Sequence, residues 1–327
     1  MSIFSYFYKS ALIVGMCVVF SSVALAQYPS KPITLIVNYP AGGALDLAAR
    51  AIASHLSNQF GKTIVVENKP GASGLIGAEF ASRQKPDGYT MLATIDSLVT
   101  VNPYIFGEKR FDPDEKLELL GLLGTFNQVL LVPKDSAITD MAALVKLSKT
   151  KELNYSSAGA GTPGHLAMES LKLAANINIM NIPFNGNAPA LNALLGKQVD
   201  AGFLALGGST LQHVKAGSLI PLAVSGKMRD LNLPEVPTVA ESSLNGLKDF
   251  DMEFAFFLMA PKGIDRDIAE KWNAAIANAM QSDQIKSQFD NLNIHRIKGS
   301  RQEAKQWLST YGRRIHDTIK KAKITVE

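Results

Sequence analysis

The chain has 327 residues, of which 46% are hydrophobic, and it carries a formal net charge of +4. A chain of this length usually forms two domains, and this hydrophobic content is enough for two cores. The basic residues are scattered except for a modest cluster between Arg313 and Lys323. This cluster fits the solvated face of a C-terminal helix better than a nucleic-acid site, so we expect no nucleic-acid partner.

The first 26 residues have the pattern of a secretory signal peptide. Lys9 is followed by an apolar run from Ala11 to Phe20, and Ala24-Leu25-Ala26 forms an A-x-A cleavage site. A retained anchor is the alternative, but the apolar run is short for a membrane span. Cys17, the only cysteine, lies inside this run. We therefore expect a periplasmic protein, cleaved after Ala26, with neither a disulfide nor thiol chemistry.

Strands and helices alternate along the rest of the chain. In the first part, apolar periodicity predicts strands at 33–39, 63–67 and 89–94 and helices at 43–60, 73–83 and about 98–104, followed by an irregular stretch. A second run predicts strands at 128–133, 153–157, 178–183, 198–204 and 219–225 and helices at 139–149, 163–175, 187–196 and 208–216. The C-terminal part predicts a strand at 252–261, helices at 265–281 and 301–323, and a short strand at 293–297.

This alternation predicts an α/β fold with a mainly parallel sheet in each of two domains. The strand-rich block lies between two apolar segments, so domain 1 is expected to comprise residues 27–126 and 253–327, and domain 2 residues 127–252. Two crossings between the domains form a hinge, and the cleft between the lobes is the natural ligand site.

Two Gly-rich turns, at 40–46 and 159–165, each follow a predicted strand and open a helix. Such a helix start presents unpaired backbone N–H groups and the positive end of the helix dipole, so two of them facing one cleft can hold a carboxylate. The second turn also matches the dinucleotide fingerprint G-x-G-x-x-G. That motif needs an acidic residue about twenty positions later, and none is present, so we expect no nicotinamide cofactor.

Several polar residues near these turns have two open interpretations. Asp46 either contacts ligand or complements its helix dipole, and Asp96, between Thr94 and Ser97 at a strand end, faces either the cleft or solvent. If it faces the cleft, Asp96 favours a ligand with an amine or a neutral tail. His165 either contacts ligand or caps its helix, and Asp200 either positions a cleft water or braces a turn.

The sequence resembles the Bug family, the periplasmic solute-binding proteins of tripartite tricarboxylate transporters. The motifs that carry the resemblance, in the same order along the mature chain, are Tyr39–Asp46, Val66–Gly74, Pro86–Tyr89, Ser157–Thr162 with His165-Leu166, Gln198–Asp200 and Leu233–Glu241. The resemblance implies a type II, Venus-flytrap receptor for small organic acids, with the membrane subunits of such a transporter as partners. We expect it to be a monomer. The ligand carboxylate would meet backbone and hydroxyl groups from both lobes.

The sequence departs from the family pattern at the mouth of domain 2. In the loop 183–186, Asn185 replaces the usual Lys and Phe184 the usual Tyr, and Glu253–Phe257 stands where the family places a Trp and a Gly. These departures disfavour a highly charged ligand such as citrate and favour a monoanion or a less charged solute. The expected ligand-binding residues are Tyr39, Pro40, Ala41, Gly42, Gly43, Asp46, Thr94, Asp96, Ser97, Ser157, Ala158, Gly159, Gly161, Thr162, His165, Phe184, Asn185, Gly186 and Asp200.

Two other functions stay open. A receptor that reports occupancy to a membrane sensor has the same sequence features as a transport receptor. A periplasmic enzyme is the alternative of a different class, but the five histidines have no metal-ligand spacing and no G-x-S-x-G elbow occurs. We therefore expect no catalytic residue, no metal and no cofactor.

Overall fold

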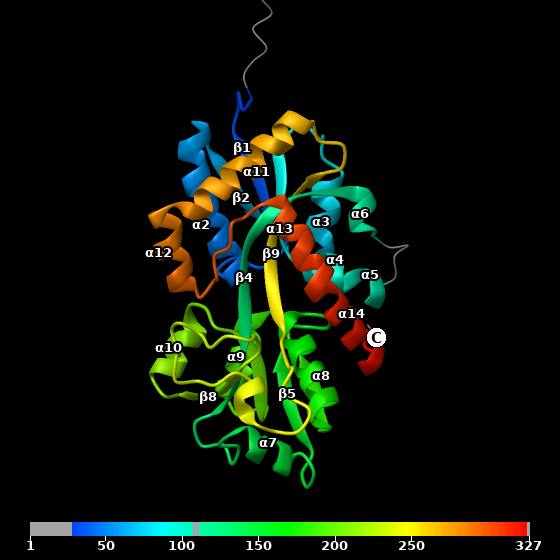
Figure 1. The fold of residues 1–327 in the computed structure, drawn as a ribbon, viewed down its shortest axis with the longest axis vertical. Helices are drawn as coiled ribbons and strands as arrows, with labels where there is room; N and C mark the ends of the chain where they lie inside the picture. The colour runs from blue at the N-terminus through cyan, green and yellow to red at the C-terminus, as the bar shows by residue number, and fades with distance from the viewer. Residues whose placement is uncertain (1–27, 107–110, 326–327) are drawn as a thin grey trace, which may run out of the picture.

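The computed structural model describes residues 28–106 and 111–325, so the expected signal peptide and its cleavage site lie outside the described residues. Within these ranges a nine-stranded sheet runs in the order β2-β1-β3-β9-β4-β7-β5-β6, with β8 paired to β4 (Figure 1). The strands are β1 (Ile33–Val37), β2 (Ile64–Asn68), β3 (Thr90–Ile95), β4 (Leu117–Pro133), β5 (Leu153–Ser157), β6 (Ile179–Pro183), β7 (Ala201–Ala205), β8 (Leu219–Val224) and β9 (Glu253–Pro261).

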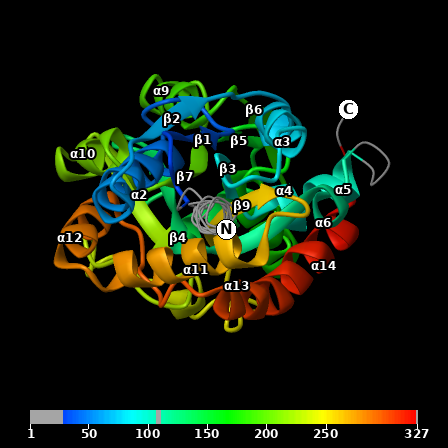
Figure 2. The same cartoon turned by 90° about the horizontal axis from the view of Figure 1, so that it is seen from above.

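Helices cover both faces of this sheet. Seen from above, the strands lie between α3 on one side and α11 and α13 on the other (Figure 2). The helices are α2 (Ala44–Phe60), α3 (Leu75–Ser82), α4 (Ser97–Thr100), α5 (Asn102–Ile105), α6 (Pro113–Lys116), α7 (Met141–Leu147), α8 (Pro163–Ala175), α9 (Asn187–Leu195), α10 (Ser209–Lys215), α11 (Arg266–Gln281), α12 (Asp283–Leu292), α13 (Arg301–Trp307) and α14 (Arg313–Ala322). In the described part of the chain, none of these helices is both long and apolar enough to cross a membrane.

The α/β class is confirmed, but the sheet is mixed rather than mainly parallel. β1 pairs in parallel with β2 and β3, and β5 with β6 and β7, whereas every pair that includes β4 or β9 is antiparallel. The reason is the length of β4, whose first half pairs with β9 and whose second half pairs with β7 and β8. This one strand therefore joins the two groups of parallel strands.

The first half of β4 is also the main difference from the predicted elements. The stretch before 128 is a strand, not an irregular segment, and its register against β9 shifts near Gly121 and Gly124. A helix at 283–292 was not expected, and the predicted strand at 293–297 is reduced to one bridge between Thr125 and His295. The predicted helix at 301–323 is interrupted by a π-helical turn at 308–312. Most other elements agree with the prediction to within about three residues at each end.

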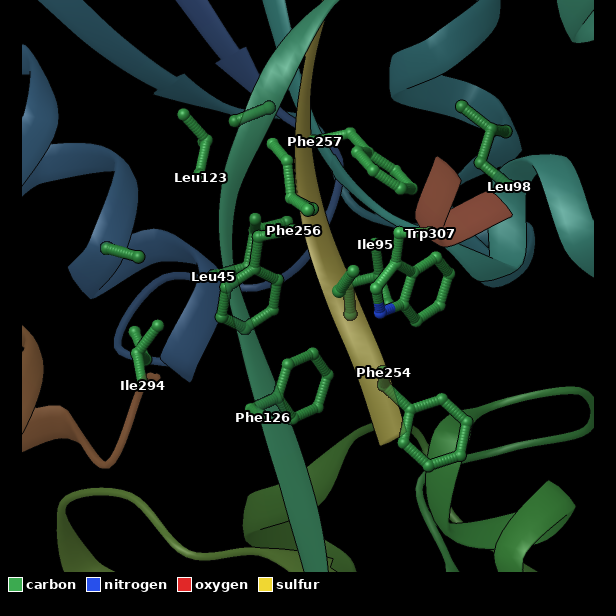
Figure 3. Close-up of a cluster of buried hydrophobic side chains, with 14 of the residues drawn as sticks. Leu45, Ile95, Leu98, Leu123, Phe126, Phe254, Phe256, Phe257, Ile294 and Trp307 are labelled. Carbon is green, nitrogen blue, oxygen red and sulfur yellow. The ribbon is translucent and has the colours of Figure 1, made fainter. Parts of the chain in front are cut away.

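Aromatic side chains line the paired strands β4 and β9. The rings of Phe126 and Phe256 are stacked, with centroids 4.3 Å apart and planes 18° from parallel. Phe257 and Trp307 form an edge-to-face pair on the opposite face of β9 (Figure 3), because successive side chains of a strand alternate between faces. All four are buried, so the hydrophobic core is continuous along this strand pair.

Helix α8 lies very close to β7, and this approach requires a glycine. A Cβ added at Gly164 would lie 2.1 Å from the carbonyl oxygen of Phe203. We expect Gly164→Ala to lower the free energy of unfolding by about 1–3 kcal/mol, because the helix must move away from the strand. Urea denaturation of the two proteins measures the difference.

Gly207→Ala is the matched control, since a Cβ there would meet its nearest neighbours at ordinary contact distances of 3.8 and 3.9 Å. We expect this control to change the free energy of unfolding by at most about 0.5 kcal/mol. Equal losses in the two variants would contradict the packing argument.

Candidate functional site

A cavity of about 270 Å³ lies at the carboxyl ends of strands from both groups of parallel strands. Its wall is formed by the segments that follow β1, β5, β6 and β7, together with side chains from β4 and β9. Open α/β sheets bind ligands at this edge. The lining residues are Tyr39–Leu45, Leu47, Ile95, Phe126, Gln128, Ala158, Thr162–Gly164, Asn185–Pro189, Phe203, Ala205, Gly207–Ser209, Phe256 and Leu292.

Four helices begin at this cavity, and none of the four has a side-chain N-cap. α2, α8, α9 and α10 start after Gly43, Thr162, Gly186 and Gly208, and no side chain accepts from their first N–H groups. Helices that start elsewhere are of both kinds: α7, α11, α12 and α13 are capped by aspartate or serine side chains, whereas α3, α4, α5 and α14 are not. Uncapped N–H groups need another partner, and an anion is the partner that the helix dipole favours.

Within residues 28–106 and 111–325, no charged side chain lines the cavity. Its polar side chains, all neutral, are Tyr39, Gln128, Thr162, Asn185, Asn187 and Ser209. Each helix start contributes roughly half a positive charge. The positive potential of the cavity therefore comes from backbone dipoles rather than from lysine or arginine.

The rest of the wall is apolar and comes mainly from the central strands. Phe126 and Phe256 present their stacked rings, and Phe203, Ile95 and Leu292 add further apolar surface. The cavity therefore joins a polar, dipole-rich side to an aromatic side, an arrangement suited to a small amphipathic ligand.

About half of the sequence-predicted site residues line this cavity. They are Tyr39, Pro40, Ala41, Gly42, Gly43, Ala158, Thr162, Asn185 and Gly186. Ser157, Gly159, Gly161 and Phe184 belong to the same turns but are not part of the wall. Gly161 has φ +71°, and a Cβ there would lie 2.5 Å from Cδ1 of Ile105, so this glycine lets the turn pack against α5.

Asp46 lies behind the first turn and outside the cavity wall. Its carboxylate accepts hydrogen bonds from the Gly42 N–H (2.9 Å), Arg50 Nε (3.0 Å) and Asn68 Nδ2 (2.9 Å). Burial alone would raise the pKa of Asp46, but the hydrogen bonds from Arg50, Gly42 and Asn68 outweigh it and hold the pKa below its usual range. The ionised Asp46 therefore fixes the conformation of the turn that forms the wall.

The three residues at the end of β3 are also buried behind the wall. Thr94 accepts from Asn38 Nδ2 at 2.9 Å, and Ser97 Oγ lies 3.4 Å from the Tyr39 hydroxyl. Asp96 faces neither the cleft nor solvent, because it is fully buried and accepts from the Ala255 N–H (3.0 Å) and Thr100 Oγ1 (3.1 Å). It joins the end of β3 to β9 and gives no reason to expect an amine on the ligand.

His165 and Asp200 also have structural roles here. His165 Nδ1 accepts from the Gly161 N–H at 2.9 Å and so fixes the second turn, while burial lowers the pKa of His165. Asp200 lies at the amino end of β7, the edge opposite the cavity, where it accepts from the Asn154 N–H at 2.9 Å. It braces that turn. No group of three or more His, Cys, Asp or Glu is arranged to hold a metal in the described ranges.

The sequence analysis missed several residues of the wall. Asn187 and Ser209 follow glycines after a predicted strand, so the pattern of the two recognised turns was present there too. Phe126 was missed because the first half of β4 was not predicted as a strand. Gln128, Phe203 and Phe256 lie in strands that were predicted, but their side chains were not expected to face the cavity.

The comparisons with known proteins agree with one another. The family model described as tripartite tricarboxylate transporter family receptor matches residues 48–324. A UPF0065 protein of a Pseudomonas species is 33% identical over 278 residues, which cover 84% of this chain and 82% of the relative. The solved periplasmic binding protein BugD is similar with a TM-score of 0.81 and 28% identity, over 91% of this chain and 100% of that one. An R. palustris protein solved with adipate is similar with a TM-score of 0.83 and 26% identity, with the same coverage.

The buried position of Asp96 predicts a specific pH dependence of stability. Burial raises the pKa of Asp96 to about 7, against 3.8 ordinarily, so the folded chain keeps a proton that the unfolded chain loses. The resulting stabilisation is complete below about pH 4 and is lost as the pH rises through about 7. In denaturant unfolding at a series of pH values, Asp96→Asn should become more stable relative to the parent by about 4 kcal/mol between about pH 4 and pH 8.

Asp249→Asn, at an exposed position, is the control and should follow the parent at every pH. If the difference in free energy of unfolding between Asp96→Asn and the parent were the same at every pH, Asp96 would ionise normally in the folded chain.

Proposed function

The chain belongs to the tripartite tricarboxylate transporter receptor family, and we propose that it captures a small organic acid in the cavity between two lobes. The fold and the family are those of periplasmic solute-binding proteins. In this proposal the lobes are residues 27–126 with 253–327, and residues 127–252. The acid is handed to the membrane subunits of a transporter after the exported, monomeric chain has lost residues 1–26, and no reaction is catalysed.

One observation carries the proposal: the uncapped starts of α2, α8 and α9 surround one cavity, which is lined by no charged side chain among the described residues. A carboxylate accepts several hydrogen bonds at once and is stabilised by the positive ends of helix dipoles. The adipate in a structural relative of 26% identity is consistent with this chemistry.

Hydrogen bonds between the two proposed lobes support a closed arrangement. Ser73 Oγ donates to the Ala160 carbonyl oxygen at 3.1 Å on one side, and Asn232 Nδ2 donates to the Asp290 carbonyl oxygen at 3.1 Å on another. With the proposed bounds, α2 belongs to one lobe and α8, α9 and α10 to the other. A carboxylate that accepts from both lobes binds the closed arrangement better than an open one, so it shifts the population toward closure.

The test is thermal unfolding of the mature chain, refolded to remove bound cargo, with a panel of mono-, di- and tricarboxylates and neutral controls. A ligand at a hundred times its Kd should add about 2.7 kcal/mol of stability. We expect at least one acid to raise the melting temperature by several degrees and the neutral controls to leave it unchanged. No shift with any acid would contradict the proposal.

Asn187→Asp tests the helix starts directly. Asn187 opens α9 and lines the cavity, so an aspartate there complements the α9 dipole, and we expect stability without ligand to stay equal or rise by about 0.3–1 kcal/mol. The same charge repels a carboxylate, so affinity for the acid should fall at least about tenfold in calorimetry.

Asn192→Asp, at an exposed position on the same helix, is the matched control and should bind like the parent. Equal affinities in the two variants would mean that the α9 start does not face the bound acid.

A further inference from the structure

The side chain of Gln128 is buried, lines the cavity and has no hydrogen-bond partner among the described residues. Its backbone is held firmly, because its N–H donates to Ser225 Oγ and its carbonyl oxygen accepts from the Ser225 N–H, both at 2.9 Å. Gln128 is 3% exposed. Since the amide faces the cavity, the groups that can pair with its donors and acceptor, water or a ligand, must lie in the cavity.

Gln128 stands where the two sides of the cavity meet. It is two residues after Phe126 on β4, so both side chains project from the same face of the strand. Its amide also lies at the start of α8, since a Cβ added at Gly164 would be 3.5 Å from Gln128 Oε1. A group bound to this amide is therefore next to a helix start on one side and next to the stacked rings on the other.

The aromatic side of the cavity has no group that could pair with a second charge on the ligand. Phe126, Phe256 and Phe203 have no polar atoms in their side chains, and no lysine or arginine of the described part of the chain lines the cavity. A carboxylate pressed against these rings would be buried without a partner, which is strongly unfavourable. An apolar body is favoured there, and a flat one can also stack.

The volume limits the size of the body. The cavity has a volume of about 270 Å³. A small acid such as hexanoate or benzoate fits within it.

From these four observations, and resting on the proposed function, we infer that the solute is a small monocarboxylate with an apolar body. Its carboxylate lies between the helix starts and the amide of Gln128, and its body lies against Phe126 and Phe256. The aromatic side of the cavity thus selects against acids that carry a second charge at that end.

The test uses pairs of acids that differ by one carboxylate: hexanoate with adipate, and benzoate with terephthalate. Calorimetry on the refolded mature chain should give at least tenfold tighter binding for the monocarboxylate of each pair. Benzamide, which keeps the ring of benzoate and loses the charge, should bind at least tenfold more weakly than benzoate.

Gln128→Met keeps the volume of the side chain and removes its amide, so affinity for the monocarboxylate should fall about tenfold or more. Gln302→Met, at an exposed position on α13, is the control and should bind like the parent. The melting temperature without ligand shows whether each variant is folded, and the acid pairs on the parent chain test the inference independently of any variant.

The outcomes separate this inference from the proposed function. If the dicarboxylates bind as tightly as their partners or more tightly, the inference is overturned while acid binding in the cavity stands. If no acid binds, both fail. Unchanged affinity of Gln128→Met for the monocarboxylate would show that the Gln128 amide does not bind the carboxylate.

Discussion

The whole site depends on the antiparallel pairing of two strands, β4 and β9. β4 pairs with β9 over its first half and with β7 and β8 over its second half. This single strand therefore connects the two groups of parallel strands. This arrangement brings the carboxyl ends of β1 and β5 to one place from opposite directions. It also leaves Phe126, Gln128 and Phe256 in the gap between them, on strands that cannot be displaced without breaking the sheet.

Around this strand pair, the groups in contact with the cavity and the groups that hold them in place are different residues. The wall contains backbone, neutral polar side chains and aromatic rings, whereas the ionisable residues of the two turns lie one layer behind. Asp46 holds the first turn through the Gly42 N–H, and His165 holds the second through the Gly161 N–H. The cavity can therefore have a positive potential without a charged side chain in its wall, because the potential comes from helix dipoles whose turns Asp46 and His165 hold in place.

The sequence predicted the parts of this site that depend on local patterns. A strand, a Gly-rich turn and an amphipathic helix are encoded within about twenty residues, so both turns and most element boundaries were predictable. The course of β4 was not predictable, because two glycines and flanking charged residues interrupt the apolar pattern of 117–127. Its pairing with β9 depends on contacts between residues more than a hundred positions apart in the sequence. For Asp96 both alternatives were wrong, and for Asp200 the brace of a turn was the correct one of the two. A carboxylate at a strand end can face a cleft, a neighbouring strand or the opposite edge, and only the assembled sheet decides among them.

In the proposed binding mode, the helix starts hold the solute as an anion without help from a cationic side chain. The most direct measurement is the pH titration of an isotope-labelled carboxylate carbon in bound hexanoate or benzoate, followed by nuclear magnetic resonance. Dipoles that stabilise the anion must lower the pKa of the bound acid, so the bound carboxylate should stay ionised at pH values where the free acid is already protonated. A bound acid that takes up its proton at the same pH as the free acid, or at a higher one, would contradict the account, because the cavity would then favour the neutral acid.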